Sequence, residues 1–189
     1  MAGVLETARI LAKQKKTLKR NVEFAFYTLE EAPFFGTEYM GSYVHAKSLA
    51  KQHKQIDAVY VLDNIGYYNE NSVQNYPTTL KWLYPKHANF IAAIGNLQSG
   101  RLTSNYCRHM KKLNTLQCEQ IVAPSFLHYF NQAGHINYWA QGLPTVLISD
   151  TGYYRNPHDQ SAQDSIEHLN LDKMADVVNG LAATVSNLE

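Results

Sequence analysis

The sequence lacks a strong charge of either sign, a long apolar run and a set of cysteines. Its 189 residues carry a formal net charge of +1, which gives no electrostatic reason to expect nucleic acid or an anionic membrane as a partner. No apolar run approaches the roughly 18 residues that a membrane-spanning helix needs. Cys107 and Cys118 are too few for a disulfide framework or a metal knuckle. Two cysteines fit a reducing compartment, and the absence of a signal-peptide pattern predicts a cytoplasmic protein.

Two common functional motifs are also missing. Ser125 and Ser149 lack the Gly-x-Ser-x-Gly pattern of a nucleophile elbow, which argues against a serine hydrolase. No glycine-rich phosphate loop follows an expected strand, which argues against a nucleotide site. The length suits a single domain over residues 1–189, large enough to bury a core.

The sequence does contain alternating strand and helix patterns. Strand patterns occupy residues 22–27, 56–62, 90–94, 116–122 and 145–148. Helical spacing occupies residues 2–13, 37–52, 99–112 and 136–141, and a last helix follows Asn170, a residue type suited to cap it. Residues 66–89 are expected to form a long loop. The alternation predicts an α/β fold, a three-layer sandwich with a mixed, mostly parallel central sheet.

Acidic residues stand where three of these strands end. Glu30 and Glu31 follow the first strand, Asp63 follows the second, and Asp150 follows the last. If these strands are neighbours, the carboxylates meet at one edge of the sheet, where hard oxygen ligands suit a divalent metal. The simpler alternative for a Glu-Glu pair is a solvated turn. Zinc sites generally add His or Cys, but His135 and His158 are each more often surface or core residues than ligands.

Four segments resemble those of the co-catalytic zinc aminopeptidases, metallopeptidase family 28, in that family's order. They are TLEEAPFFGTEYMGS (28–42), VLDNIGYY (61–68), AGHINYWAQGLPTVLISDT (133–151) and RNPHDQSAQDS (155–165). The resemblance covers essentially the whole chain. It implies a zinc-exopeptidase-like fold that lacks its first strands, because the family has a His-x-Asp strand upstream of anything in this sequence.

The resemblance also implies roles for individual residues. Glu30 matches the general base, Glu31 matches a ligand of one zinc, and Asp63 matches a ligand of the other. Gln160 stands where the family has its last His ligand, and His158 is a candidate substitute two residues away. Gly134 replaces an aspartate of the family. Tyr67 and Tyr68 follow Asp63 and could rim a substrate pocket, or they could equally pack the long loop against the domain.

These departures leave too few ligands for two zinc ions, because a catalytic zinc takes three protein ligands and a water. We therefore expect an inactive aminopeptidase-like domain that does not bind zinc by itself. The alternative is an active aminopeptidase, acting on a peptide substrate, whose missing ligands come from an upstream segment or a second chain. Without a cation, we expect at least one acid to be protonated, turned outward or paired with Arg155 or His158. An exposed sheet edge predicts a homo-oligomer or a partner that covers it.

Overall fold

The computed structural model describes residues 1–76, 81–125 and 133–188. Its central sheet has four strands in the order β1, β6, β4, β5. These strands are β1 (Val59–Leu62), β6 (Thr145–Ser149), β4 (Phe90–Gly95) and β5 (Gln117–Val122). β1 pairs parallel with β6 and β4 pairs parallel with β5, whereas β4 and β6 are antiparallel. The predicted mixed, mostly parallel sheet is confirmed.

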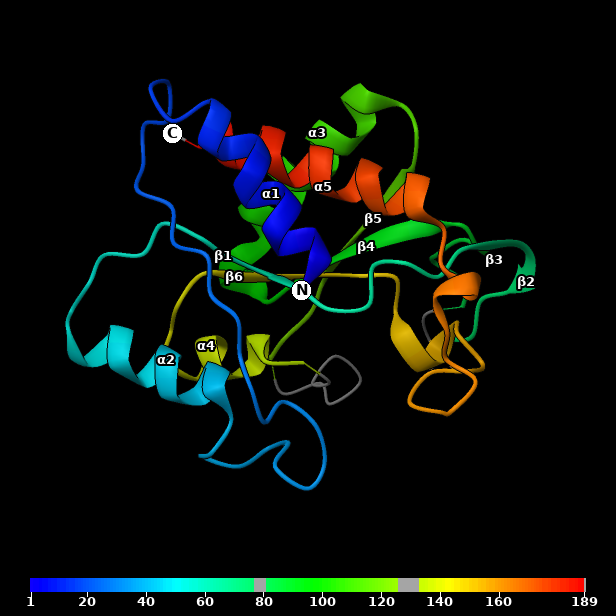
Figure 1. Cartoon of the computed structure of the whole chain (residues 1–189), viewed down its shortest axis with the longest axis horizontal. Coiled ribbons are helices and arrows are strands. Elements are labelled where there is room, and N and C mark those ends of the chain that lie inside the picture. Colours follow the sequence, from blue (N-terminus) through cyan, green and yellow to red (C-terminus); the bar gives the residue numbers. More distant parts are fainter. Residues whose placement is uncertain (77–80, 126–132, 189) are drawn as a thin grey trace.

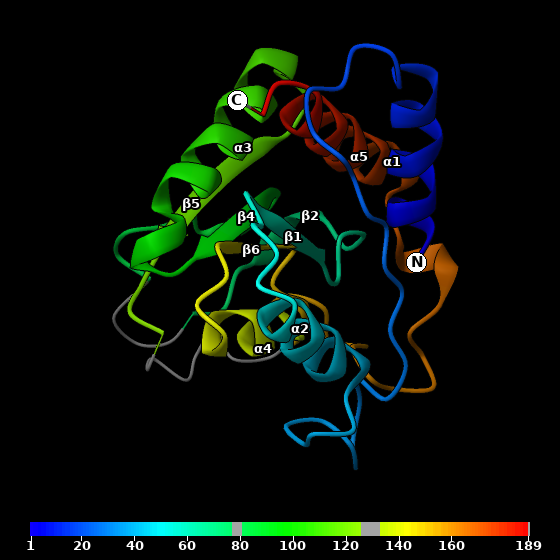
Figure 2. The ribbon, with the colours of Figure 1, turned by 90° about the vertical axis from the view of Figure 1, so that its left-hand side faces the viewer.

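Helices cover both faces of the sheet (Figures 1 and 2). On one side lie α1 (Ala2–Lys13), α3 (Gly100–Leu113) and α5 (Leu171–Ser186), and on the other lie α2 (Gly41–Lys51) and α4 (His135–Ala140). α5 packs against both α1 and α3. The Asn170 side chain accepts a 3.0 Å hydrogen bond from the Lys173 amide, which confirms it as the cap of α5.

The core is centred on β4, because every residue of this strand is buried. Successive strand residues point to opposite faces of a sheet. Ile91 and Ala93 therefore pack with α3 and α5, and Phe90, Ala92 and Ile94 pack with the opposite layer. Each helical layer thus rests on a continuous apolar surface that the continuous hydrophobic run of β4 supplies.

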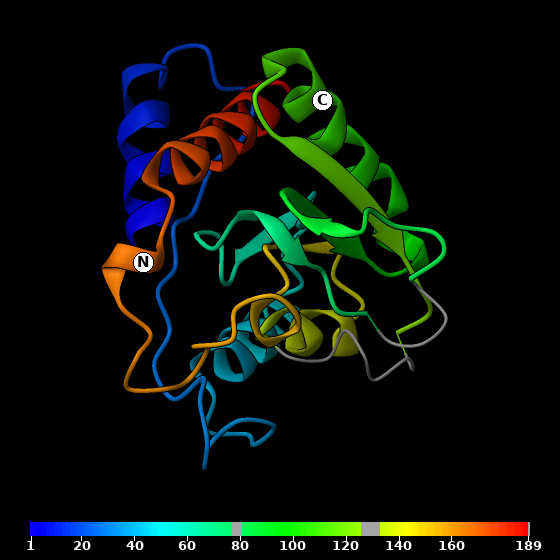
Figure 3. The same cartoon turned by 90° about the vertical axis from the view of Figure 1, so that its right-hand side faces the viewer.

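Two expected features of the backbone are wrong. Residues 22–27 form no strand, although Val22, Phe24 and Phe26 stand at alternate positions of the sequence. The long loop, of which residues 77–80 lie outside the described part, contains the antiparallel strands β2 (Asn69–Val73) and β3 (His87–Ala88), seen on the right of Figure 1 and in Figure 3. A β-strand requires a neighbouring strand with which its backbone forms hydrogen bonds, in addition to alternating side chains. Within the described chain, residues 22–27 have no such neighbour.

The two cysteines are not separate thiols. Cys107 on α3 and Cys118 on β5 form a disulfide that ties the helix to the edge strand on which it packs. This disulfide does not fit the reducing compartment that the two cysteines predicted. Within the described residues, no helix has both the length and the apolar character needed to cross a membrane.

Candidate functional site

The strand register places two of the predicted acids side by side. Leu62 of β1 lies opposite Ile148 of β6 in a parallel pair. Asp63 and Asp150, which follow these strands, therefore emerge at the same edge of the sheet. This edge is where open α/β sheets place their ligands.

The side chain of Asp150 connects two loops of the fold by hydrogen bonds. Its buried carboxylate accepts hydrogen bonds from the amides of Gly66 at 2.8 Å, Tyr67 at 2.7 Å and Gly152 at 2.9 Å. Burial raises the pKa of Asp150, and the three amide donors oppose that rise. The acid therefore fastens the loop after β1 to the loop after β6 and fixes the position of Asp63.

Asp63 lies in a concentration of negative charge. Its pKa is raised to about 6, first by burial and then by four other carboxylates, Glu31, Asp150, Asp159 and Glu30. Asp63 and Asp150 thus meet at one edge of the sheet as predicted, whereas Glu30 and Glu31 approach Asp63 from a segment that forms no strand. Asp159 was missed as a member of the cluster, although it lies inside the RNPHDQ segment between His158 and Gln160. Burial raises the pKa of Asp159 as well.

Glu30 is held by the amino-terminal end of α2. The Ser42 amide donates to Glu30 Oε1 at 2.9 Å, and the Ser42 hydroxyl donates to Oε2 at 2.8 Å. Asn137 of α4 donates in turn to Ser42 Oγ at 2.8 Å. A Cβ atom on Gly134 would lie only 2.5 Å from Glu30 Oε2, so this carboxylate occupies the space of a side chain at position 134. Glycine at this position is therefore necessary for the observed place of Glu30.

The carboxylate of Glu31 has an uncharged side chain as its hydrogen-bond partner. Gln160 donates its side-chain amide to Glu31 Oε2 at 3.2 Å. The structure thus brings together two residues that the family resemblance related to zinc-ligand positions, a contact that sequence spacing alone could not show. Both side chains are exposed, so this contact leaves Glu31 accessible to solvent.

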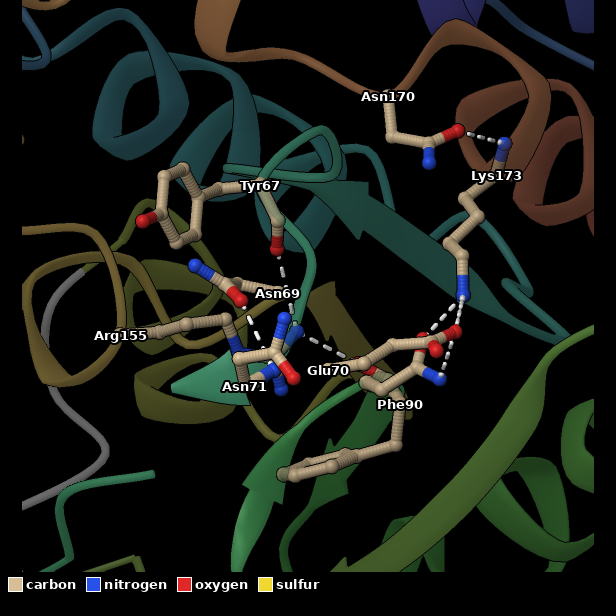
Figure 4. A network of polar contacts seen from close by, with 9 residues as sticks. Tyr67, Asn69, Glu70, Asn71, Phe90, Arg155, Asn170 and Lys173 are labelled. Carbon is tan, nitrogen blue, oxygen red and sulfur yellow. Dashed lines mark hydrogen bonds and ion pairs between the residues drawn. The ribbon is translucent and has the colours of Figure 1, made fainter. Parts of the chain in front are cut away.

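Of the three arrangements expected for the acids, pairing of Glu30, Glu31 or Asp63 with Arg155 or His158 is not observed among the described residues. Arg155 is buried and donates to Gln74 Oε1 at 2.8 Å and to the carbonyl of Phe90 at 2.7 Å. Its guanidinium also lies 4.4 Å from the centre of the Phe90 ring, and Figure 4 shows it reaching the Tyr67 carbonyl. His158 stacks on His168 with ring centres 4.3 Å apart. Arg155 therefore joins the β2–β3 side of the fold to β4.

The two tyrosines after Asp63 differ in environment. Tyr68 packs against the core beside α5 and donates to the Ile65 carbonyl at 3.1 Å. This contact favours the packing alternative for Tyr68. Tyr67 contributes its backbone to the Asp150 and Arg155 contacts, while Figure 4 shows its ring directed away from Lys173. His135 is buried edge-on against Trp139 with ring centres 4.5 Å apart, which is a core position.

The residues at this edge do not fit a dinuclear zinc centre. In the described chain, no three His, Cys, Asp or Glu side chains are placed to hold one metal ion together. Glu30 is turned into Ser42 and Gly134, and Gln160 offers only a weak amide oxygen in place of an imidazole. Zinc sites in proteins require three or four well-placed nitrogen, sulfur or oxygen donors. No reaction step can be derived through zinc from these residues alone.

Comparison with known proteins identifies the family. The family model described as Peptidase family M28 matches residues 1–185. The chain belongs to peptidase family M28. M28 peptidases are zinc-dependent in general.

Relatives and solved structures agree with this assignment. The Escherichia coli (strain K12) protein YfbL is 36% identical over 189 residues, which cover 99% of this chain and 57% of YfbL. The LapA aminopeptidase of Legionella pneumophila has the same fold, with a TM-score of 0.72 at 19% identity over 99% of this chain and 46% of LapA. LapB of the same organism gives a TM-score of 0.69 at 19% identity, over 96% of this chain and 43% of LapB. This M28 chain thus spans about half the length of the proteins it matches.

Proposed function

We propose that this M28 chain is an aminopeptidase-like domain that does not hydrolyse peptides by itself. Glu30 would be the vestigial general base, and Glu31 and Asp63 the vestigial zinc ligands. The observation that carries the proposal is the contact between Gln160 and Glu31, because an amide group hydrogen-bonds the carboxylate where the family places a metal ion.

A second candidate function is an active aminopeptidase whose missing ligands come from another polypeptide segment. It is favoured by the survival of an acid at both retained ligand positions and by the cluster of five carboxylates at the sheet edge. Tyr67 would then line the entrance for a peptide substrate. Gln160 and Gly134 count against this candidate, because a further segment would not replace either residue.

Zinc binding and turnover separate the two candidates. The purified chain is titrated with zinc and assayed for hydrolysis of a leucyl amide, with and without EDTA. We expect less than one zinc ion per chain and no EDTA-sensitive turnover. Binding of about two zinc ions together with turnover that EDTA abolishes would establish the active enzyme instead.

Restoring the family residues sharpens this test. Gln160→His adds an imidazole donor at an exposed position, and Gln160→Asn is its matched control without that donor. Gly134→Asp must also displace Glu30, because the space beside Gly134 is filled. We expect Gln160→His to bind zinc more tightly than Gln160→Asn, since imidazole is a better ligand than an amide. Equal zinc affinity of the two variants would contradict the role assigned to position 160.

A further inference from the structure

The charged residues of the chain are unevenly distributed, although its net charge is only +1. Residues 7–20 and 101–118 together hold ten of the 17 Lys and Arg residues and none of the 16 Asp and Glu residues. The rest of the chain therefore has seven basic residues against 16 acidic ones. The net charge, from which no anionic partner was expected, thus hides a strong separation of charge.

The fold brings the two basic segments to the same end of the molecule. Figures 2 and 3 show α1 and α3 both ending at the top, on either side of α5. The Ser186 hydroxyl of α5 donates to Gln14 Oε1, directly after α1, at 2.7 Å. Gly180 of α5 packs against Met110 in the last turn of α3. Only one helix therefore separates the two segments, and its residues 177–188 carry no charge.

Six exposed cations of these segments have no acidic partner. They form what we call the basic end, which consists of Lys13, Lys15, Lys16, Arg108, Lys111 and Lys112. Among the described residues, which do not include Glu189, no carboxylate forms an ion pair with any of the six. Arg9 and Arg20, by contrast, pair with Glu6 and Asp57. The six charges of the basic end are therefore presented to solvent without a counterion from the described protein.

The ends of the helices offset only part of this positive charge. α1, α3 and α5 all end here, and a helix carries about −0.5 elementary charge at its carboxyl end. Three helix ends thus offset roughly a quarter of six positive charges. The pKa of His109 on α3 is lowered, first by burial and then by the charges of Lys112 and Arg108. The basic end therefore keeps a positive potential that acts on its neighbours.

The side chains of the basic end are not those of a site for one phosphate group. Five of the six cations are Lys, whose ammonium group acts as a point charge. Recognition of a single phosphate favours the planar guanidinium of Arg, which donates two parallel hydrogen bonds. Neither the cavity beside β1 nor the cavity at the start of α1 is lined by any of the six. The arrangement suits an extended anionic surface better than an enclosed anion.

The apolar residues of the same segments favour lipid over single-stranded nucleic acid. Proteins that bind single-stranded nucleic acid stack its bases on aromatic rings. Residues 7–20 contain no Phe, Tyr or Trp, and Tyr106 on α3 is fully buried. Leu113, which follows Lys112 at the end of α3, is 38% exposed. An exposed aliphatic side chain among lysines is typical of proteins that lie on a membrane interface.

We infer that the basic end docks this chain onto an anionic phospholipid bilayer. Clusters of roughly four to eight Lys and Arg residues bind such surfaces, and each cation strengthens the binding by about fivefold. Asp63 lines the cavity at the start of α1, whereas Lys13 is the last residue of that helix. A helix of 12 residues is about 18 Å long. The docked chain would therefore keep its carboxylate cluster in the solution, away from the bilayer.

Vesicle binding tests this inference in EDTA, without reference to zinc or activity. The full chain is sedimented with vesicles of phosphatidylcholine and with vesicles that also contain roughly 30% phosphatidylglycerol. We expect binding to the anionic vesicles only. This binding should be lost at about 0.5 M salt, because salt screens the attraction between exposed charges. Equal binding to both kinds of vesicle, or no binding to either, would overturn the inference.

Two triple variants with the same change in net charge locate the docking surface. The first removes three charges from the basic end, with Lys15→Gln, Lys16→Gln and Lys111→Gln. The second removes three exposed charges from α2 and the loop after it, with Lys47→Gln, Lys51→Gln and Lys54→Gln. We expect the first variant to bind anionic vesicles on the order of a hundredfold more weakly, and the second less than about threefold more weakly. Equal losses would show that net charge rather than the basic end controls binding, which would contradict the inference.

Two other anions are tested as competitors. Glycerol phosphate that displaces the chain from vesicles, at an ionic strength where sodium chloride does not, would identify a site for a single phosphate group instead. Duplex DNA that binds more tightly than anionic vesicles at the same salt concentration would identify a nucleic-acid surface instead. None of these measurements depends on zinc or turnover, so the proposed function and this inference fail separately.

Discussion

The two halves of the sheet differ in completeness. In the half formed by β4, β5 and β6, the inner strands β4 and β6 pair on both sides and β5 forms the edge. Phe90 and Ile91 of β4 point to opposite faces of the sheet, and both are fully buried. In the half formed by β1 and residues 20–31, no strand of the described residues pairs with the outer edge of β1, and Phe24 and Phe26 are 36% and 45% exposed. The carboxylate cluster lies at the end of this open half. The difference shows that an apolar sequence pattern gives stability only where a neighbour completes the packing.

The largest effect on stability is expected when one phenylalanine from each half is replaced by alanine and the two variants are compared. Phe90→Ala should lower the free energy of unfolding by about 3–5 kcal/mol, because it leaves a cavity in a fully packed site. Phe26→Ala should change it by less than about 0.5 kcal/mol, because that ring is already 45% exposed. Urea denaturation followed by circular dichroism measures both. Equal losses would mean that the open half is packed as tightly as the closed half.

The next largest effect on stability is expected from Arg155, a buried cation that contacts β4. Arg155→Met should lower the free energy of unfolding by about 2–3 kcal/mol, because the buried Gln74 side chain and Phe90 carbonyl lose a charged donor. Arg20→Met is the control in the open half. Its ion pair with Asp57 is exposed, so it should cost at most about 1 kcal/mol. The same denaturation experiment separates them, and a larger loss for Arg20→Met would contradict the assignment of the two environments.

The third prediction uses pH to measure repulsion at the open edge. The pKa of Asp63 is raised from 3.8 to about 6, so protonation of this group favours the folded state. This stabilisation is complete below about pH 4 and is lost as the pH rises through about 6. Asp63→Asn should therefore raise stability at pH 7–8 by on the order of 2 kcal/mol and should have little effect at pH 4.

Chemical denaturation at several pH values measures this difference. Glu38→Gln, at an exposed position outside the cluster, is the control and should leave the pH dependence of stability unchanged. If Asp63→Asn destabilises the chain at pH 7–8, then a cation or a donor offsets the repulsion, and the account of the acid cluster is incorrect.

The smallest effects compare the two anchors of the glutamate pair. Ser42→Ala should cost about 1 kcal/mol, because buried Ser42 bonds Glu30 and accepts a bond from Asn137. Gln160→Ala should cost less than about 0.5 kcal/mol, because its bond to Glu31 is exposed. Thermal unfolding followed by circular dichroism checks both. A greater loss for Gln160→Ala would show that the exposed contact, rather than Ser42, organises the site.

Some residues of the candidate site could be predicted from the sequence, because their place depends only on where a strand ends. The acids after β1 and β6 are predictable because parallel strands end at one edge of the sheet. Glu30 and Glu31 were predicted from a strand at residues 22–27 that does not form, and the family resemblance assigned roles to them. Asp159 and the contact of Gln160 with Glu31 were missed, since both depend on a loop that folds back across more than a hundred residues. The displacement of Glu30 toward Gly134 also required coordinates, because it results from space that a missing Cβ leaves.

The sequence by itself determined those elements whose stability is local or fully buried, such as α1 with its predicted bounds, the apolar run of β4 and the Asn170 cap of α5. Only the tertiary structure decided the fate of residues 22–27 and the disulfide between Cys107 and Cys118. The physical reason is the same in both cases. Helical spacing, capping and burial are properties of one segment, whereas strand pairing and cysteine pairing require a second segment at the correct distance.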